Sequence, residues 1–155
     1  MNYTARFFSL FLAGFILGCN PYRSDLPPRI HFGRDVCDEC CMVISEERFA
    51  AAFLDSEGNL LKFDEIGCLV LNRMRQAQEL KYVWVHDYET NAWIDGRKAV
   101  YVHAETLSTP MARGLVAFSN PDAAERFAQK EKGVLVSWEE LEAIMKKEKH
   151  VHLTE

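Results

Sequence analysis

Residues 115–136 read LVAFSNPDAAERFAQKEKGVLV, and this stretch predicts a strand, a helix and a second strand in that order. The apolar runs 115–118 and 134–136 have the length of short strands. Asn120 before Pro121 is typical of a helix start. Backbone N–H groups in the first helical turn have no partner within the helix, so a proline there loses no hydrogen bond. Residues at helical spacing form the apolar face of this helix: Ala124, Phe127 and Ala128.

The first half of the chain repeats this order. Two apolar runs, 49–54 and 59–63, flank the turn sequence DSEG and predict a hairpin. Asp64 is then positioned to cap a helix, and a strand is expected at 81–86. The apolar stripe of the helix between them contains Ile66, Leu69, Val70, Met74 and Ala77.

A further strand candidate, 99–103, supplies the missing first strand of the second half. The sequence therefore predicts an α+β fold of two ββαβ units, 34–90 and 91–150, packed in one compact body, with two small lobes as the alternative. Ser137 and Glu140 have the spacing of a capping box and predict a C-terminal helix. Its inward side chains are Leu141, Ile144 and Met145.

Charge and motif content exclude several classes of function. The chain has 155 residues, with 18 basic and 23 acidic side chains and a net charge of −5. This balance argues against nucleic-acid binding through a positive surface field. The sequence contains neither a Ser/His/Asp arrangement nor a phosphate-binding loop, so we expect a protein that is not an enzyme.

The N-terminus has the features of an export signal. The apolar run 7–17 is followed by Gly18 and Cys19, which resembles the bacterial lipobox. The interpretation is a signal peptide over 1–18, a lipid on Cys19, and a tether over 19–33 that contains three of the five prolines. Asn20 after the cysteine favours the outer membrane, facing the periplasm. An ordinary signal peptide or an uncleaved anchor is the alternative.

The sequence CDECCM at 37–42 places three thiols and a thioether within six residues. Thiolate and thioether ligands favour Cu(I) over hard ions. Cys40 and Met42 would point to the same side of an extended segment. Three alternatives stay open: a zinc site completed by Cys41, Cys68 or a histidine, redox chemistry of Cys37 with Cys40, and structural disulfides.

A second thioether, Met111, falls in a Pro/Gly loop at 108–114 and is a further candidate ligand. The alternative is a loop hydrophobe folded onto the body. We expect Cys68 to be a buried, inert thiol, with a disulfide to Cys37 or Cys41, or metal ligation, as the less favoured interpretations. His86 and His103 end strands and are expected to be edge or surface residues.

These motifs occur in one order, with FDEIGC at 63–68, TPM at 109–111 and LVAFS at 115–119 after the cysteine cluster. The combination resembles the NosL family of lipoprotein accessory factors for nitrous-oxide reductase. The resemblance implies two ββαβ units, Cu(I) binding, and copper supply to that reductase together with a membrane ABC-type assembly.

The same resemblance implies that Cys40, Met42 and Met111 are metal ligands. Cys37 is a possible additional ligand, and so is Cys41, which stands where the family usually has glycine. We therefore expect a lipid-anchored periplasmic copper chaperone that releases its ion by ligand exchange. The alternatives are a thiol-disulfide redox lipoprotein acting through Cys37 and Cys40, a metal-free interaction domain with structural disulfides, and a copper chaperone for a different copper enzyme.

Overall fold

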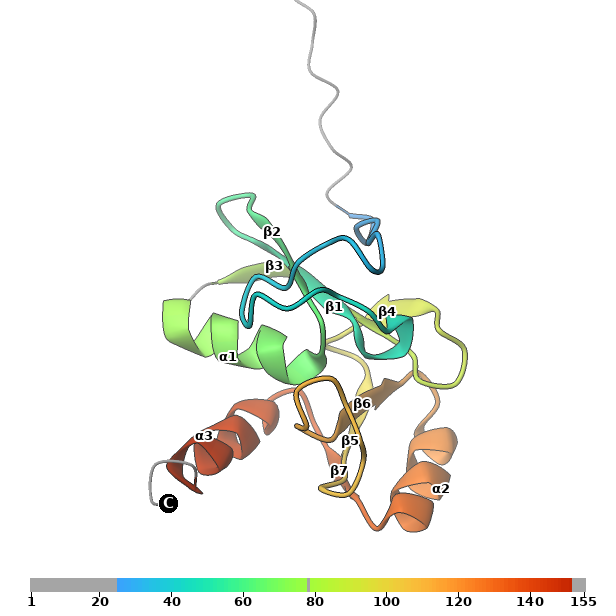
Figure 1. The fold of residues 1–155 in the computed structure, drawn as a ribbon. Helices are drawn as coiled ribbons and strands as arrows, with labels where there is room; N and C mark the ends of the chain where they lie inside the picture. Colours follow the sequence, from blue (N-terminus) through green and yellow to red (C-terminus); the bar gives the residue numbers. More distant parts are fainter. Residues whose placement is uncertain (1–24, 78, 152–155) are drawn as a thin grey trace, which may run out of the picture.

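The computed structural model describes residues 25–77 and 79–151, with side chains to Lys146, so the expected signal peptide and Cys19 lie outside the described residues. Figure 1 shows two small sheets, each with its own helix, and a last helix beside the first. The strands and helices, after the short 3-10 turn Glu47–Phe49, are β1 (Ala51–Asp55), β2 (Leu60–Phe63), α1 (Ile66–Gln76), β3 (Leu80–His86), β4 (Trp93–Asp95), β5 (Val100–His103), β6 (Leu115–Phe118), α2 (Pro121–Glu131), β7 (Val134–Val136) and α3 (Leu141–Val151).

Both sheets are antiparallel and share one topology. The first has the order β2-β1-β3-β4, and the second has the order β6-β5-β7. In each, the first strand of the unit lies between its hairpin partner and the strand that follows the helix. The predicted α+β fold of two ββαβ units is therefore confirmed, with β4 as an additional strand paired to β3.

The helix starts show which local signals act as expected. Asn120 caps α2 as predicted: its side chain accepts from the Asp122 N–H, and Pro121 occupies the first turn. The expectation that Asp64 caps α1 is wrong, because the N-cap is Glu65 and makes no capping hydrogen bond. The Asp64 carboxylate instead accepts the backbone N–H of Ser45 at 3.2 Å, which fixes the chain before β1.

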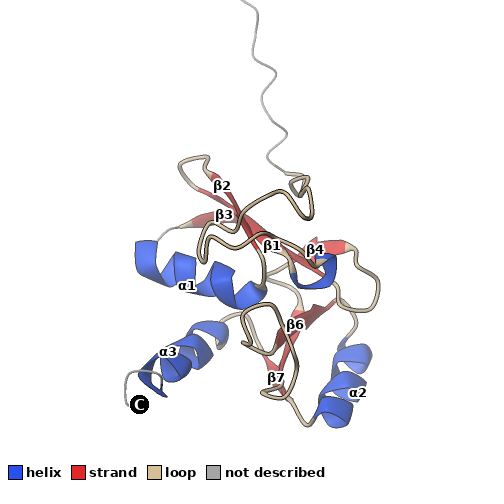
Figure 2. Ribbon diagram, in the orientation of Figure 1, coloured by secondary structure: helices blue, strands red, loops and turns tan. Residues whose placement is uncertain are grey.

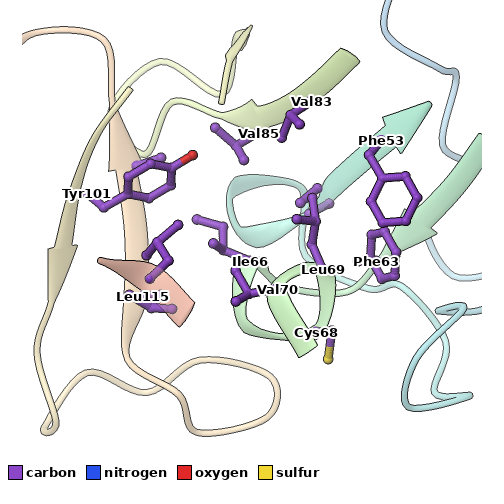
Figure 3. Close-up of a cluster of buried hydrophobic side chains, with 14 of the residues drawn as sticks. Phe53, Phe63, Ile66, Cys68, Leu69, Val70, Val83, Val85, Tyr101 and Leu115 are labelled. Atoms are coloured by element: carbon purple, nitrogen blue, oxygen red, sulfur yellow. The ribbon is translucent and has the colours of Figure 1, made fainter. Parts of the chain in front are cut away.

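The two units share one hydrophobic core. Phe53 and Phe63 from the first sheet pack with ring centroids 5.1 Å apart, and Tyr101 and Leu115 from the second sheet join the same cluster. Figure 3 shows the α1 side chains, including Leu69, between these groups. The helix α3 adds two fully buried side chains, Leu141 and Met145, as its predicted apolar face requires. Because one cluster contains residues of both units, they form a single body.

Asp87 joins the sheets at the end of β3. It forms an isolated parallel bridge with Ala117 of β6. Its Oδ2 accepts the N–H of Ser119 at 2.7 Å and the hydroxyl of the same residue at 2.6 Å. Its Oδ1 accepts the N–H groups of Glu89 and Thr90, both at 3.0 Å. One buried carboxylate thus ties the first unit to the start of α2 in the second.

The segment before β1 is mostly irregular and lies across the first sheet (Figure 2). Within the range expected to be a tether, Ile30 is part of the hydrophobic core, and the Arg29 carbonyl accepts from Lys62 Nζ at 2.8 Å. The end of that range therefore packs on the body. In the part of the chain that the structure describes, no helix is both long and apolar enough to cross a membrane.

Candidate metal site

The cysteine-rich segment forms a narrow hairpin held by backbone hydrogen bonds. Val36 and Val43 form an antiparallel bridge at its base. The Cys37 N–H donates to the Met42 carbonyl at 2.8 Å, and the Cys41 N–H donates to the Cys37 carbonyl at 3.1 Å. Cys41 adopts a left-handed conformation with φ 61°, in the region that favours glycine. The tight turn brings Cys37 and Cys40 to one side.

Hydrogen bonds anchor this hairpin to β2 and α1. The Asp38 N–H donates to the Lys62 carbonyl at 2.9 Å, and Asp38 Oδ2 accepts the Lys62 N–H at 2.7 Å. The buried Asn72 amide donates to the Asp38 carbonyl at 3.3 Å and to Glu39 Oε2 at 3.0 Å. Arg75 pairs with the same Glu39 carboxylate at 2.7 Å. The hairpin tip is therefore fixed against the helix that contains Cys68.

Three thiols meet at this contact. The sulfur atoms of Cys37, Cys40 and Cys68 all lie within 4.8 Å of one another. Cys37 and Cys68 are each 1% exposed, whereas Cys40 is partly exposed. Figure 3 shows Cys68 on α1 at the edge of the hydrophobic cluster. Of the three thiols, Cys40 is the one that solvent reaches.

The thiols differ in acidity. A hydrogen bond from the Cys68 thiol, which outweighs burial, lowers the pKa of Cys37 below its usual range. The same hydrogen bond, together with burial, raises the pKa of Cys68. Burial raises the pKa of Cys40. Three sulfur donors in one small group are a soft donor set suited to Cu(I).

The donor set is small for a structural zinc site, which normally closes with four nitrogen or sulfur ligands. Within residues 25–77 and 79–151 the three thiols are the one such group of histidine, cysteine or carboxylate ligands. The expectation that His86 is an edge or surface residue is wrong, because it is buried on an inner strand and outside the three-thiol group. Its Nδ1 is 2.9 Å from the Ala50 carbonyl, and its ring centroid is 3.7 Å from that of Trp93. Cys37, Cys40, Cys41 and Cys68 are all free, so none of them forms a structural disulfide here.

The Met111 loop lies against the first turn of α1. Met111 is partly buried and packs on the hydrophobic cluster that contains Cys37 and Cys68. Its N–H donates to Glu65 Oε2 at 3.1 Å. A Cβ added at Gly67 would lie 2.1 Å from Cδ of Arg113, so the loop approaches this turn as closely as a glycine allows. The distant methionine and the thiols therefore come to the same end of α1.

Glu65 is unusual as a buried acid at this contact. Burial raises its pKa, against hydrogen bonds from Thr109 and Met111 and the charge of Arg113, which favour the carboxylate. Arg113 Nε lies 3.3 Å from Glu65 Oε1, and Glu65 is only 1% exposed. An ion pair between a buried carboxylate and a partly exposed guanidinium thus lies at this end of α1.

Met42 and Cys41, two further candidate ligands, have exposed side chains. The Met42 side chain is 57% exposed, beside the exposed side chains of Val36 and Val43. Cys41 is also exposed and lies outside the three-thiol group. The structure thus brings together Cys37 and Cys40, places Met111 on the same core cluster, and leaves Met42 and Cys41 facing solvent.

Cys68 is the member of the three-thiol group that its expected role as an inert thiol did not predict. Its predicted burial is confirmed, but it lies with Cys37 and Cys40 rather than alone in the core. The available signal was its position at the start of α1, directly after β2, because β2 is the strand on which the cysteine hairpin rests.

The geometry agrees with two comparisons. The family model described as NosL matches residues 31–145. The crystal structure of the copper chaperone NosL from Shewanella denitrificans matches with a TM-score of 0.63 and 21% identity, covering 74% of this chain and 96% of that one. At this identity the match shows a shared fold. The curated proteins include no match to this chain.

Proposed function

The chain belongs to the NosL family, and on that basis we propose that it is a Cu(I)-binding copper chaperone and not an enzyme. The observation that supports this most directly is the group of three thiols, Cys37, Cys40 and Cys68, at the end of α1 where the Met111 loop packs. Soft sulfur donors in a small group suit Cu(I), which is satisfied by two or three ligands.

In this proposal Cys40 is the central ligand, because it is the partly exposed thiol of the three and an ion can enter and leave there. The Met111 thioether approaches from the second unit, and the exposed Met42 thioether closes over the ion from the solvent side. Cys37 and Cys68 are the further thiols within reach of Cys40. Cys41 is assigned no ligand role, since it lies outside that group.

Release proceeds by ligand exchange. Thioethers are neutral donors, so a site with one thiolate and two thioethers has little net charge to retain the ion. A thiolate or thioether of the acceptor protein binds Cu(I) on its exposed side, next to Met42, and the chaperone ligands then dissociate one at a time. The exposure of Met42 supports this order, because an exposed side chain can move without disturbing the core.

The client and location follow from the family resemblance. We propose that Cys19 is lipidated, that the domain faces the periplasm from the outer membrane, and that the acceptor is nitrous-oxide reductase or the membrane ABC-type assembly that matures it. A different copper enzyme is the alternative client. The net charge of −5 supports a protein partner over nucleic acid.

The test is an anaerobic Cu(I) titration of the reduced chain against a competing chelator. One-to-one binding that is weakened by Cys40→Ser and by Met111→Leu is expected. Met145→Leu is the matched control, because Met145 is a fully buried methionine on α3 and a Leu replacement nearly conserves its volume. Binding that is unchanged by both ligand variants would contradict the proposed site.

A second function is favoured by the same thiol geometry. Three sulfurs within 4.8 Å also suit thiol-disulfide exchange through Cys37 and Cys40. That activity would survive Met42→Leu and Met111→Leu, whereas Cu(I) binding at the proposed site would not. A metal-free interaction domain predicts that the chain neither binds Cu(I) nor exchanges disulfides.

A further inference from the structure

Glu65 directs its hydrogen bonds to another part of the chain. It is the N-cap residue of α1 but makes no side-chain capping bond to its own helix. Its carboxylate instead faces the loop at 109–113. Oε2 accepts the N–H of Met111 at 3.1 Å, the Thr109 hydroxyl also hydrogen-bonds to the carboxylate, and Oε1 lies 3.3 Å from Arg113 Nε. One buried acid thus contacts the loop at three points.

The loop at 109–113 is also stabilised by its own internal hydrogen bonds. The Thr109 hydroxyl oxygen accepts the N–H of Arg113 at 3.0 Å and that of Gly114 at 3.2 Å. Gly114 has φ +59°, and a Cβ there would lie 2.2 Å from the Ala104 carbonyl oxygen, so the chain turns tightly against the end of β5. These contacts make the loop a compact unit whose orientation toward α1 depends on its contacts with the Glu65 carboxylate.

Glu65 and Cys68, one of the three clustered thiols, lie at the first turn of α1. Cys68 follows Glu65 by three residues, a spacing that places two side chains on neighbouring parts of a helix surface. Gly67 lies between them, with room for Arg113 against its backbone. A displacement of the carboxylate would therefore change the position of the Met111 loop relative to Cys68.

A buried carboxylate at position 65 is less favourable in free energy than an apolar side chain would be, if the position serves only packing. Burial of a charge is unfavourable unless hydrogen bonds and an opposite charge offset it, and here the offsetting groups come from the Met111 loop. We propose that Glu65 is a positioning residue, which holds the Met111 thioether against the thiol cluster so that it can complete the coordination of Cu(I). This inference rests on the proposed function and assigns a residue outside its ligand set.

A double-mutant cycle on the full chain tests this inference. Cu(I) affinity is measured by anaerobic competition with a chelator for the unmodified chain, Glu65→Gln, Met111→Leu and the double variant. We expect Glu65→Gln to weaken binding roughly 10–100-fold, as removal of groups that orient metal ligands does elsewhere. In the Met111→Leu background the same substitution is expected to change the affinity less than about twofold, because the ligand on which it acts is gone.

The matched control is Asp87→Asn. Asp87 is also a buried carboxylate with several hydrogen bonds, but its partners are Glu89, Thr90 and Ser119 rather than the Met111 loop. It is expected to lower stability and leave Cu(I) affinity unchanged. X-ray absorption of the Cu(I)-loaded chain adds a structural readout, because the number of coordinated sulfur atoms should fall by one in Glu65→Gln and not in Asp87→Asn.

If Glu65→Gln does not fold, Thr109→Val takes its place in the same cycle. That variant removes one hydrogen bond to Glu65 and the acceptor that tightens the loop. Equal losses of affinity with and without the Met111→Leu substitution, or an unchanged sulfur count, would overturn the positioning role while leaving the chaperone proposal intact. An unmodified chain that does not bind Cu(I) would instead overturn the proposed function, and with it this inference.

Discussion

The side-chain amide of Asn72 donates to the main-chain carbonyl of Asp38 across 3.3 Å, and this contact locks α1 to the tip of the cysteine hairpin. Asn72 is fully buried and donates to Glu39 Oε2 as well. A polar residue thus occupies a helix position that would otherwise suit an apolar one. Its hydrogen bonds are among the contacts that hold the hairpin of Cys37 and Cys40 against the helix that contains Cys68.

Replacing Asn72 by Ala should lower both stability and Cu(I) affinity. The Asp38 carbonyl and the Glu39 carboxylate each lose a donor, which is expected to cost about 1–3 kcal/mol in the free energy of unfolding. The affinity should fall because the hairpin is no longer fixed to α1. Urea denaturation and Cu(I) competition measure the two effects. Gln129→Ala, at an exposed position of α2, is the control and should change stability by less than about 0.5 kcal/mol. Full retention of affinity in Asn72→Ala would show that the hairpin is positioned by other contacts.

The left-handed backbone of Cys41 predicts that Cys41→Gly is tolerated. With φ 61° the cysteine is strained by roughly 1–2 kcal/mol, while glycine adds up to about 1 kcal/mol of chain entropy to the unfolded state. The variant is therefore expected to be at least as stable as the unmodified chain in urea denaturation. Its Cu(I) affinity should stay within about twofold, because Cys41 lies outside the thiol cluster. A large loss of affinity would make Cys41 a ligand.

The close approach at Gly67 predicts a strong effect of one added methyl group. The new Cβ would lie 2.1 Å from Cδ of Arg113 and 3.0 Å from Oε1 of Glu65, so Arg113 must move. Gly67→Ala is expected to destabilise the chain by about 1–3 kcal/mol, as overpacking does, and to weaken Cu(I) binding. In the Arg113→Ala background the added methyl group no longer meets the arginine side chain, so Gly67→Ala should destabilise the chain less. Unfolding and titration of all four forms measure the difference. Strictly additive losses would mean that Arg113 is not the obstacle.

Asp87 gives the chain an acid-sensitive connection between its sheets. Burial raises the pKa of Asp87, but hydrogen bonds from Ser119 and Thr90 outweigh it and hold the pKa below the usual range. The carboxylate thus stabilises the fold fully above its unfolded pKa of about 3.9, and this contribution disappears as pH falls through the lower folded value.

Asp87→Asn should therefore be less stable than the unmodified chain by about 1–3 kcal/mol at pH 7, and the difference should shrink as pH falls below about 4. Urea denaturation of both proteins across this pH range measures it, and because only the difference between them is used, the effects of other acids largely cancel. A difference that stays constant down to the lowest pH would mean that the Asp87 charge does not contribute.

Local signals predicted much of the fold. The strands Leu115–Phe118 and Val134–Val136 have the predicted bounds, since glycine or proline and polar residues delimit them on the chain itself. The strand Trp93–Asp95 was not expected, because three residues contain too little pattern and it is defined by pairing with β3. The start of α1 shifted by one residue, because Asp64 is used by the distant Ser45.

The candidate site was predictable only in part, because contacts between residues far apart in the sequence assemble it. Sequence spacing groups Cys37, Cys40, Cys41 and Met42. The fold keeps Cys37 with Cys40 but leaves Cys41 outside that group, because the turn at Cys41 directs its thiol away from that of Cys40. The inclusion of Cys68 depends on the pairing of Asp38 with Lys62, a contact over 24 residues that no local pattern reveals. The contact of Glu65 with Met111 spans 46 residues and is equally invisible to spacing.

The shared topology of the two units bears on the origin of the chain. The helices α1 and α2 each have 11 residues, and Cys68 is the third residue of the first, where Ala123 is the third of the second. Both side chains are buried against a sheet of the same strand order. This is the pattern expected when an ancestral ββαβ gene segment is duplicated and one copy specialises. The second copy then kept the architecture without the cysteines of the first.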